Sequence, residues 1–124
     1  MFEPYTLIKI KFIPHPSSSY HVEEDTTAYG VFKKIGYEKH KKKKNVMTMY
    51  FEVDTILPVE NQWNYGEVPE YLPDAHLTLY SWDFEELPFE NAPEFLKELL
   101  LSPAALTHKL SGIRVLAKRL QNVT

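Results

Sequence analysis

Residues 46–53, VMTMYFEV, alternate between apolar and polar side chains and are rich in residues that favour β-structure. A period of two places successive side chains on opposite faces, so this stretch predicts a half-buried strand. Its core-facing residues are expected to be Met47, Met49, Phe51 and Val53. A single strand cannot bury such a face, and the segments on either side of it therefore decide the fold.

Three further segments are predicted to form strands of the same sheet. Residues 5–13 (YTLIKIKFI) and 76–82 (HLTLYSW) alternate in the same way, whereas residues 28–38 (AYGVFKKIGYE) alternate less cleanly and contain two glycines. The lysine-rich residues 39–45 indicate a hairpin with a basic tip. Within 76–82, the side chains expected to point outward are His76, Thr78, Tyr80 and Trp82.

The spacing of apolar residues becomes helical after residue 90. Asn91 and Pro93 form a helix-start signal, and Ser102 with Pro103 repeats it. Strands first and helices last predict one α+β domain over residues 1–124, with an antiparallel sheet of about four strands and two C-terminal helices packed on one face. The helices are expected to cover the face that carries Ile8, Phe12, Met49, Phe51, Leu77 and Leu79.

Composition excludes several kinds of site. The chain has no cysteine, which removes disulfides, thiol catalysis and cysteine-ligated zinc. No apolar run approaches the roughly 18–20 residues of a membrane helix, and residues 1–14 lack the pattern of a signal peptide. We therefore expect a cytoplasmic, non-enzymatic protein with no membrane partner, no cofactor and no metal.

Charge is distributed in three blocks along the chain. Residues 1–51 contain nine lysines and five acids, residues 52–98 contain one lysine and twelve acids, and residues 99–124 contain four basic residues and no acid. Both tryptophans and several tyrosines lie in the acidic block. Aromatic side chains supply affinity at protein interfaces and charge steers the encounter, so this combination is typical of a surface for a basic protein.

The leading hypothesis is therefore a protein-binding domain with a basic partner, used as an immunity protein or inhibitor. Small acidic proteins that block basic nuclease toxins combine the same residue types, which is an analogy of surface and not of motif. The alternative is that the acidic block meets the chain's own basic ends. The predicted partner-binding residues are Tyr50, Trp63, Tyr65, Glu67, Glu70, Tyr71, Asp74, His76, Tyr80, Trp82, Glu85 and Glu86.

A second hypothesis is nucleic-acid binding at the basic hairpin tip. Neighbouring lysines neutralise phosphates without reading sequence, and outward aromatic residues stack on bases. The residues concerned are Lys41, Lys42, Lys43 and Lys44 at the tip, with Tyr50, Tyr80 and Trp82 on the sheet. The same uncovered sheet face is also a candidate contact in a homodimer.

A third hypothesis rests on the sequence His76-Leu77-Thr78-Leu79, which resembles one half of the 2H phosphoesterase pattern. That family uses two strand-borne motifs that face each other, so that one histidine acts as base and the other as acid. The remaining His-x-Ser of this chain, His15-Pro16-Ser17, lies in a proline turn. The resemblance implies a catalytic role for His76.

A mixed histidine and carboxylate cluster near the N-terminus is the remaining candidate for a metal site. His15 and His21 flank a serine turn, with Glu23, Glu24 and Asp25 close by in sequence. A metal site needs three or four converging ligands, and no established spacing is present. Solvated loop charges are the expectation there.

Overall fold

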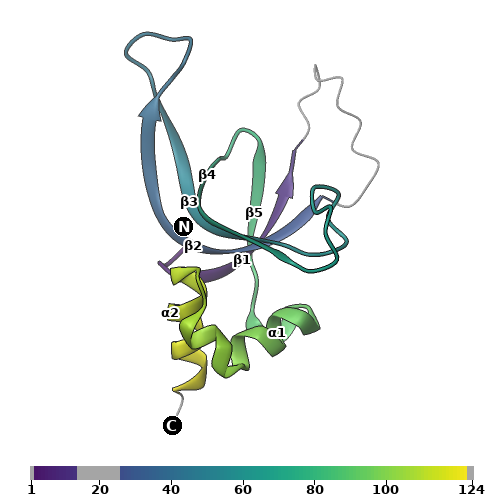
Figure 1. Ribbon diagram of the computed structural model, residues 1–124. Coiled ribbons are helices and arrows are strands. Elements are labelled where there is room, and N and C mark those ends of the chain that lie inside the picture. The colour runs from purple at the N-terminus through teal and green to yellow at the C-terminus, as the bar shows by residue number, and fades with distance from the viewer. Residues whose placement is uncertain (1, 14–25, 123–124) are drawn as a thin grey trace.

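The computed structural model describes residues 2–13 and 26–122, which form a five-stranded antiparallel sheet and two C-terminal α-helices (Figure 1). The predicted α+β fold is therefore confirmed, with one more strand than the sequence indicated. The strands are β1 (Thr6–Phe12), β2 (Thr27–Lys39), β3 (Met47–Leu57), β4 (Glu70–Thr78) and β5 (Trp82–Glu86). Short 3-10 helices precede the two α-helices, in the order Phe89–Asn91, α1 (Glu94–Leu101), Pro103–Thr107 and α2 (Ser111–Gln121).

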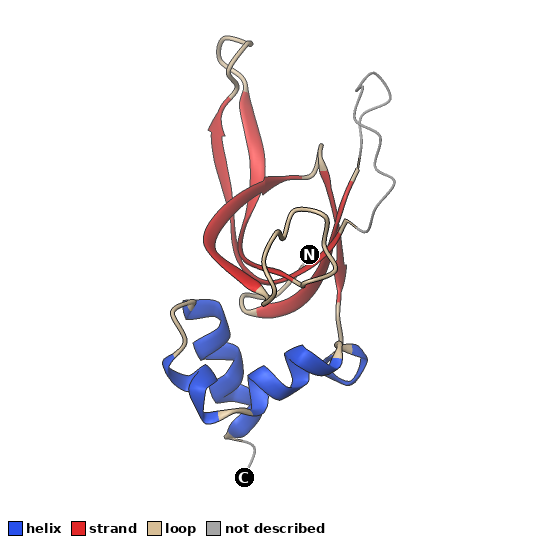
Figure 2. Ribbon diagram, turned by 45° about the vertical axis from the view of Figure 1, so that its right-hand side comes forward, coloured by secondary structure: helices blue, strands red, loops and turns tan. Residues whose placement is uncertain are grey.

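The sheet curls so strongly that its two edge strands meet at one end. The strand order β4-β3-β2-β1-β5 puts β4 and β5 at opposite edges, yet only residues 79–81 join them along the chain. The amide of Ile13 donates a 2.8 Å hydrogen bond to the carbonyl of Ser81, which ties this turn to the end of β1. Figure 2 shows the strands wrapped around an interior, so the sheet has an inner and an outer face.

Glycine makes the closest approach within this bend possible. A side chain at Gly30 in β2 would place its Cβ 2.9 Å from the carbonyl oxygen of Asp54 and 3.0 Å from the side chain of Ile10. Both distances are well inside ordinary van der Waals contact, so β1 and β3 could not close on β2 around a larger residue. A register shift between Phe32 and Lys34 adds to the bend.

The inner face of the curled sheet encloses one apolar cluster, which we call the inner core. Its buried residues are Ile8, Ile10, Ala28, Phe32, Phe51, Val53 and Leu57. Phe2 packs its ring edge-on against Phe32 and Phe51, at centroid distances of 5.8 and 6.0 Å. The curvature of the sheet therefore buries these side chains without any helix.

Helices α1 and α2 cover the outer face and form a second cluster, the helix-side core. Its sheet residues are Leu7, Val31 and Ile56, and its helix residues include Leu96, Leu100, Ile113 and Ala117, with Leu110 just before α2. The predicted helix-covered face was therefore wrong, because Ile8, Met49, Phe51 and Leu77 belong to the inner core and Leu79 is exposed. Both faces of this sheet are apolar, and a period of two does not tell which face the helices cover.

Three predicted boundaries also differ from the structure. The strand predicted at 46–53 continues to Leu57, and the strand predicted to start at residue 76 already begins at Glu70, which leaves a loop at residues 58–69. The strand predicted at 76–82 is interrupted by a turn, so that Trp82 begins β5. The helix start predicted at Ser102 and Pro103 opens a 3-10 helix instead, and α2 begins only at Ser111.

A buried carboxylate joins the sheet to α2. Asp54 on β3 has no solvent exposure, and its Oδ2 accepts a 2.7 Å hydrogen bond from the amide of Gly112 in the first turn of α2. Its Oδ1 accepts a 3.0 Å hydrogen bond from the amide of Asp74 on β4, and the Nζ of Lys33 on β2 lies 3.5 Å from the same oxygen. One side chain thereby connects three strands to a helix.

Lys33 and Asp74 complete this network. The Nζ of Lys33 lies 2.6 Å from Oδ1 of Asp74. The hydrogen bond from Lys33, followed by its charge, lowers the pKa of the Asp74 carboxyl. Burial alone would lower the pKa of Lys33, but the hydrogen bond to Asp74 and the charge of Asp54 raise it above its usual value. Both side chains are therefore held in their charged forms.

His108 shapes the chain where it enters α2. Its Nδ1 accepts a 3.1 Å hydrogen bond from the amide of Leu110, and its ring meets Tyr71 edge-on at 4.5 Å. Burial, and then the charges of Lys109 and Arg114, lower the pKa of His108, while the charge of Asp54 acts in the opposite direction. A nitrogen that accepts a hydrogen bond has to be unprotonated, so the fold uses the neutral imidazole.

Replacing Asp54 with alanine should lower the free energy of unfolding by about 3 kcal/mol or more, because the buried amide of Gly112 and the partly buried amide of Asp74 lose their acceptor and Lys33 loses a partner. Urea denaturation followed by circular dichroism measures this change. Asp83→Ala on β5 is the matched control, because Asp83 is exposed, and it should change stability by less than about 0.5 kcal/mol. An Asp54→Ala variant as stable as the parent would contradict the role given to this carboxylate.

Stability should also depend on the protonation of His108. Because the folded state lowers the pKa of this histidine, the stabilising contribution is complete above the unfolded pKa of about 6.5 and is lost as the pH falls through the folded value. The free energy of unfolding should therefore decrease between pH 7.5 and pH 5. Its slope with pH is set by the extra proton, at most one, that the unfolded state binds at His108. Urea denaturation across this range measures the decrease.

The variant His108→Asn isolates this contribution from the other histidines. An asparagine oxygen can accept the same amide proton from Leu110 but does not titrate. The variant should consequently lose less stability than the parent as the pH falls. Equal pH dependence in the two proteins would show that His108 does not couple protonation to folding.

Candidate functional site

The predicted partner-binding residues do not form one surface, because several of them are used inside the fold. Trp63 and Trp82 belong to the inner core, where their ring centroids lie 5.8 Å apart. Each also packs edge-on against Phe12, at 5.4 and 5.2 Å. The expectation that Trp82 faces outward was therefore wrong: the two tryptophans close one end of the inner core.

Tyr71 and Asp74 are also engaged internally. Tyr71 packs against the helix-side core and the ring of His108, and burial raises the pKa of its hydroxyl. Asp74 binds Lys33 and donates its amide to Asp54. Substituting either residue would disturb the network that holds α2, so an effect of the substitution on partner binding could not be separated from an effect on folding.

His76 and Tyr50 form a stacked pair on the sheet. Their ring centroids are 4.0 Å apart with 15° between the planes, and Nε2 of His76 lies 3.5 Å from Oε1 of Glu52. The tyrosine ring also lies over Gly36, where a side chain would collide with it. His15, the other half of the phosphoesterase pattern, lies outside the described residues. The described contacts of His76 are those of a packed cross-strand pair.

The acids of β5 lie beside the lysines of β1. The register pairs Asp83 with Lys11 and Glu85 with Lys9, so opposite charges face each other across this edge of the sheet. Glu86 pairs with Ile8 and is exposed. Part of the acidic block thus lies next to the chain's own basic N-terminal strand, which reduces the negative field that β5 presents to a partner.

The loop at residues 58–69, between β3 and β4, is held in place by two buried asparagines. Nδ2 of Asn64 donates to the carbonyl of Leu57 at the end of β3 and to the loop carbonyls of Pro58 and Val68, at 3.0 to 3.2 Å, and its Oδ1 accepts from the amide of Gly66. Asn61 donates to the carbonyl of Thr27 at 2.7 Å and accepts from the amide of Trp63. These bonds satisfy backbone groups that a sheet or helix would otherwise pair, and they fix the loop without regular structure.

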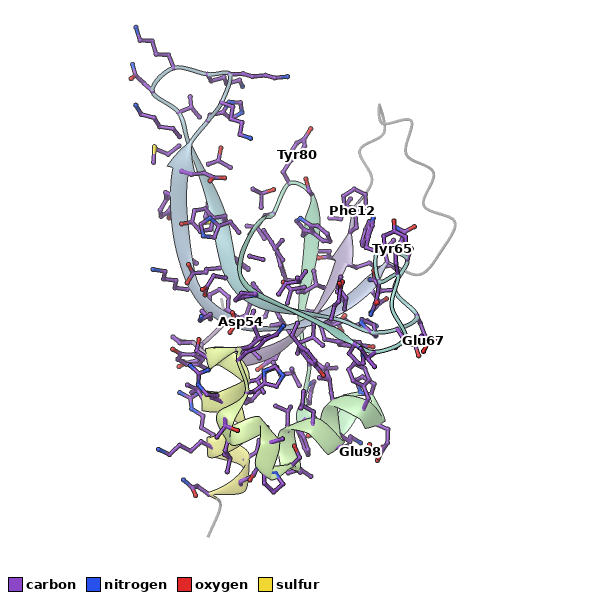
Figure 3. All side chains as sticks on the ribbon, in the orientation of Figure 1. Phe12, Asp54, Tyr65, Glu67, Tyr80 and Glu98 are labelled. Atoms are coloured by element: carbon purple, nitrogen blue, oxygen red, sulfur yellow. The ribbon has the colours of Figure 1, made fainter. Side chains whose placement is uncertain are left out.

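This loop presents an exposed tip that combines acidic, apolar and aromatic side chains. Tyr65 is 93% exposed and Val68 is 68% exposed, with Glu67 between them in sequence. Figure 3 shows Tyr65 and Glu67 on the same side of the molecule. We refer to the exposed residues of this loop and its two ends as the loop surface, which consists of Val59, Glu60, Tyr65, Glu67, Val68, Glu70 and Leu72.

The lysine run lies at the tip of the β2–β3 hairpin, which projects beyond the rest of the sheet (Figure 1). Lys41, Lys42, Lys43 and Lys44 are all exposed. The aromatic sheet face predicted to accompany them is not formed, because Tyr50 stacks on His76 and Trp82 lies in the inner core. Tyr80, in the turn between β4 and β5, is 72% exposed.

Sequence reasoning did not identify Asp54, Asn61 and Asn64, although all three shape this region. Asp54 carried a usable signal, because it interrupts the apolar run VDTIL at residues 53–57 and a carboxylate buried there needs partners. The asparagines carried none, since an asparagine in a proline-containing loop is equally typical of an exposed turn.

No family model, curated protein or solved structure matches this chain. Within residues 2–13 and 26–122, no three histidine, aspartate or glutamate side chains are grouped to hold a metal ion. The candidate ligands His15, His21, Glu23, Glu24 and Asp25 lie outside these ranges. In the same ranges, no helix has the length and apolar character needed to cross a membrane.

Replacing Asn64 with alanine should release the loop. The three carbonyls and the Gly66 amide lose their side-chain partner, which should lower the free energy of unfolding by roughly 2 kcal/mol and speed amide exchange in residues 58–69. Hydrogen–deuterium exchange with mass spectrometry measures the second effect. Asn91→Ala, at an exposed position before α1, should leave loop exchange unchanged, and unchanged exchange in Asn64→Ala would mean that the asparagine does not hold the loop.

Proposed function

We propose that this protein is a non-catalytic domain that binds a basic protein partner through the loop surface. The observation that carries the proposal is the exposure of Tyr65 on a loop whose backbone is fixed by Asn61 and Asn64. A tyrosine loses little conformational entropy when it is buried, and a loop that is already ordered loses little more on binding. Tyr65 is therefore suited to act as an anchor in a partner's pocket.

The charge of the loop surface supports a basic partner. Glu60 and Glu67 in the loop and Glu70 at the start of β4 are exposed. Residues 58–78, which include the whole loop and β4, contain no lysine or arginine. Rim charges of one sign mainly raise the rate of association with an oppositely charged partner and discriminate against others of like charge.

An inhibitor or immunity protein is the specific form that this proposal takes. Such a protein needs an anchor, a charged rim and a stable scaffold, and it needs no catalytic group of its own. If the partner is a basic enzyme, occupation of its positively charged cleft by the loop surface would block access of an anionic substrate. Binding of the partner can be measured independently of any inhibition of the partner's activity.

Site-specific photocrosslinking tests the proposal while the partner is still unidentified. A benzophenone-bearing amino acid replaces Tyr65 in one variant and Tyr37 in a matched variant, since Tyr37 is 63% exposed on β2. In cells that naturally produce the protein, the benzophenone at position 65 should crosslink to a basic protein that the benzophenone at position 37 does not reach. With that purified partner, Tyr65→Ala should weaken binding by about 30-fold, which corresponds to an anchor worth about 2 kcal/mol.

Charge reversal provides the second arm of the experiment. Glu67→Lys combined with Glu70→Lys should slow association and flatten its salt dependence, whereas Glu94→Lys combined with Glu98→Lys on α1 should change neither by more than about two-fold. Two results would overturn the proposal. One is crosslinking of the same proteins from positions 65 and 37, and the other is partner binding that neither Tyr65→Ala nor the charge reversal of the loop surface changes.

A further inference from the structure

We infer that the β2–β3 hairpin tip and the β4–β5 turn together form a second site, which binds single-stranded nucleic acid. This site is separate from the loop surface, and the inference does not depend on the proposed protein-binding function. Pairing of β3 with β4, with Tyr50 opposite Thr78, brings the two turns to the same end of the sheet. A surface depression lies between them, lined by Glu38, Lys39, His40, Lys41, Lys42, Thr48 and Tyr80.

The positive charge at this site has no ion-pair partner among the described residues. Residues 39–44 contain five lysines, all of them exposed. The ion pairs of the described chain are made by Lys33 and His76, not by these lysines. Of the residues that the structure describes, Glu38 is the one acid that lines the depression. Lysines so close in sequence repel one another, and an external polyanion would relieve that repulsion.

The lysines are presented on an ordered turn. Nδ1 of His40 accepts hydrogen bonds from the amides of Lys42 and Lys43, both at 3.1 Å. The amide of His40 donates a 2.8 Å hydrogen bond to the carbonyl of Val46, and Asn45 adopts the left-handed conformation that closes the turn. A polyanion therefore meets lysines that are presented on an ordered backbone, and binding does not have to order that backbone.

Tyr80 favours nucleic acid over other polyanions. It lines the depression beside Lys39, Lys41 and Lys42, and most of its side chain is accessible. An aromatic ring next to several lysines is the combination that single-strand binding proteins use, because the ring stacks on a base while the ammonium groups contact phosphates. In a duplex the base faces are covered by stacking, so the site is suited to unpaired strands.

Fluorescence anisotropy with labelled single-stranded DNA and RNA probes, a thymidine 15-mer and a uridine 15-mer, tests the inference at 50 mM salt. The parent protein should bind both probes, with affinity falling as salt rises. Lys42→Gln combined with Lys43→Gln should weaken binding about ten-fold and reduce the salt slope by about 1.4, since each single-strand phosphate contact contributes about 0.7. The double variant Lys109→Gln and Lys118→Gln removes the same charge at the helical end and should stay within about two-fold of the parent.

Stacking is tested separately from charge. Tyr80→Ala should weaken binding of both probes by about five-fold or more. Tyr37→Ala is the matched control, because Tyr37 is exposed on the same hairpin but does not line the depression. It should have an effect of less than about two-fold, and circular dichroism should show that all variants remain folded.

Several outcomes would overturn the inference. One is no binding of either probe at 50 mM salt, and another is equal weakening by the two lysine double variants. If inorganic polyphosphate competes as well per charge as the probes and Tyr80→Ala has no effect, the site binds charge alone. Binding to phosphatidylserine vesicles without binding to the probes would assign the tip to a membrane surface instead.

Discussion

The hydrogen bond from the Gly112 amide to the buried carboxylate of Asp54 is the interaction on which the rest of the structure depends. It fixes α2 on the outer face of the sheet, and the same carboxylate fixes the backbone of β4 through the amide of Asp74. The contact requires glycine, because a Cβ at position 112 would lie 2.8 Å from the carboxylate and 2.9 Å from Val31. The helix can therefore dock at only one position along the sheet. Once the helices occupy the outer face, the inner face has to be closed by the sheet itself.

That closure decides which aromatic side chains remain exposed. Trp63 and Trp82 fill one end of the inner core together with Phe12. Because Trp63 anchors the β3–β4 loop from within and Asn64 binds its backbone, Tyr65 is turned toward solvent. The loop surface is thus a consequence of how the inner core is sealed. The pairing of β3 with β4 brings the β4–β5 turn, and Tyr80 with it, next to the tip of the basic hairpin.

The sequence was informative where side-chain burial follows from local pattern. Alternation located β1, β2 and β3, and the helix-start signal at Asn91 lies close to α1, whereas the signal at Ser102 opens a 3-10 helix and α2 begins only at Ser111. It failed where burial depends on distant segments. The first half of β4 was missed because Pro73 and a register shift interrupt the alternation at a sheet edge. Trp82 could not be distinguished from an exposed anchor, since its neighbours in space come from β1 and the loop. Counting charges by sequence block also overestimates the charge offered to a partner, because Lys33 and Asp54 come from different blocks and pair with each other.

The pairing of β5 with β1 also affects how the protein folds during its synthesis. Phe12 pairs with Trp82 and Ile8 with Glu86, so β1 acquires its second neighbour only after residues 82–86 have been synthesised. Such long-range pairing slows folding, because the entropy of closing a large loop has to be overcome before the contact forms. During synthesis on the ribosome, β1 to β3 emerge with two apolar faces and an unpaired edge, a state prone to aggregation. The helices follow the strands in the sequence and can dock only on a sheet that already presents Asp54, so productive folding has to await the synthesis of α2.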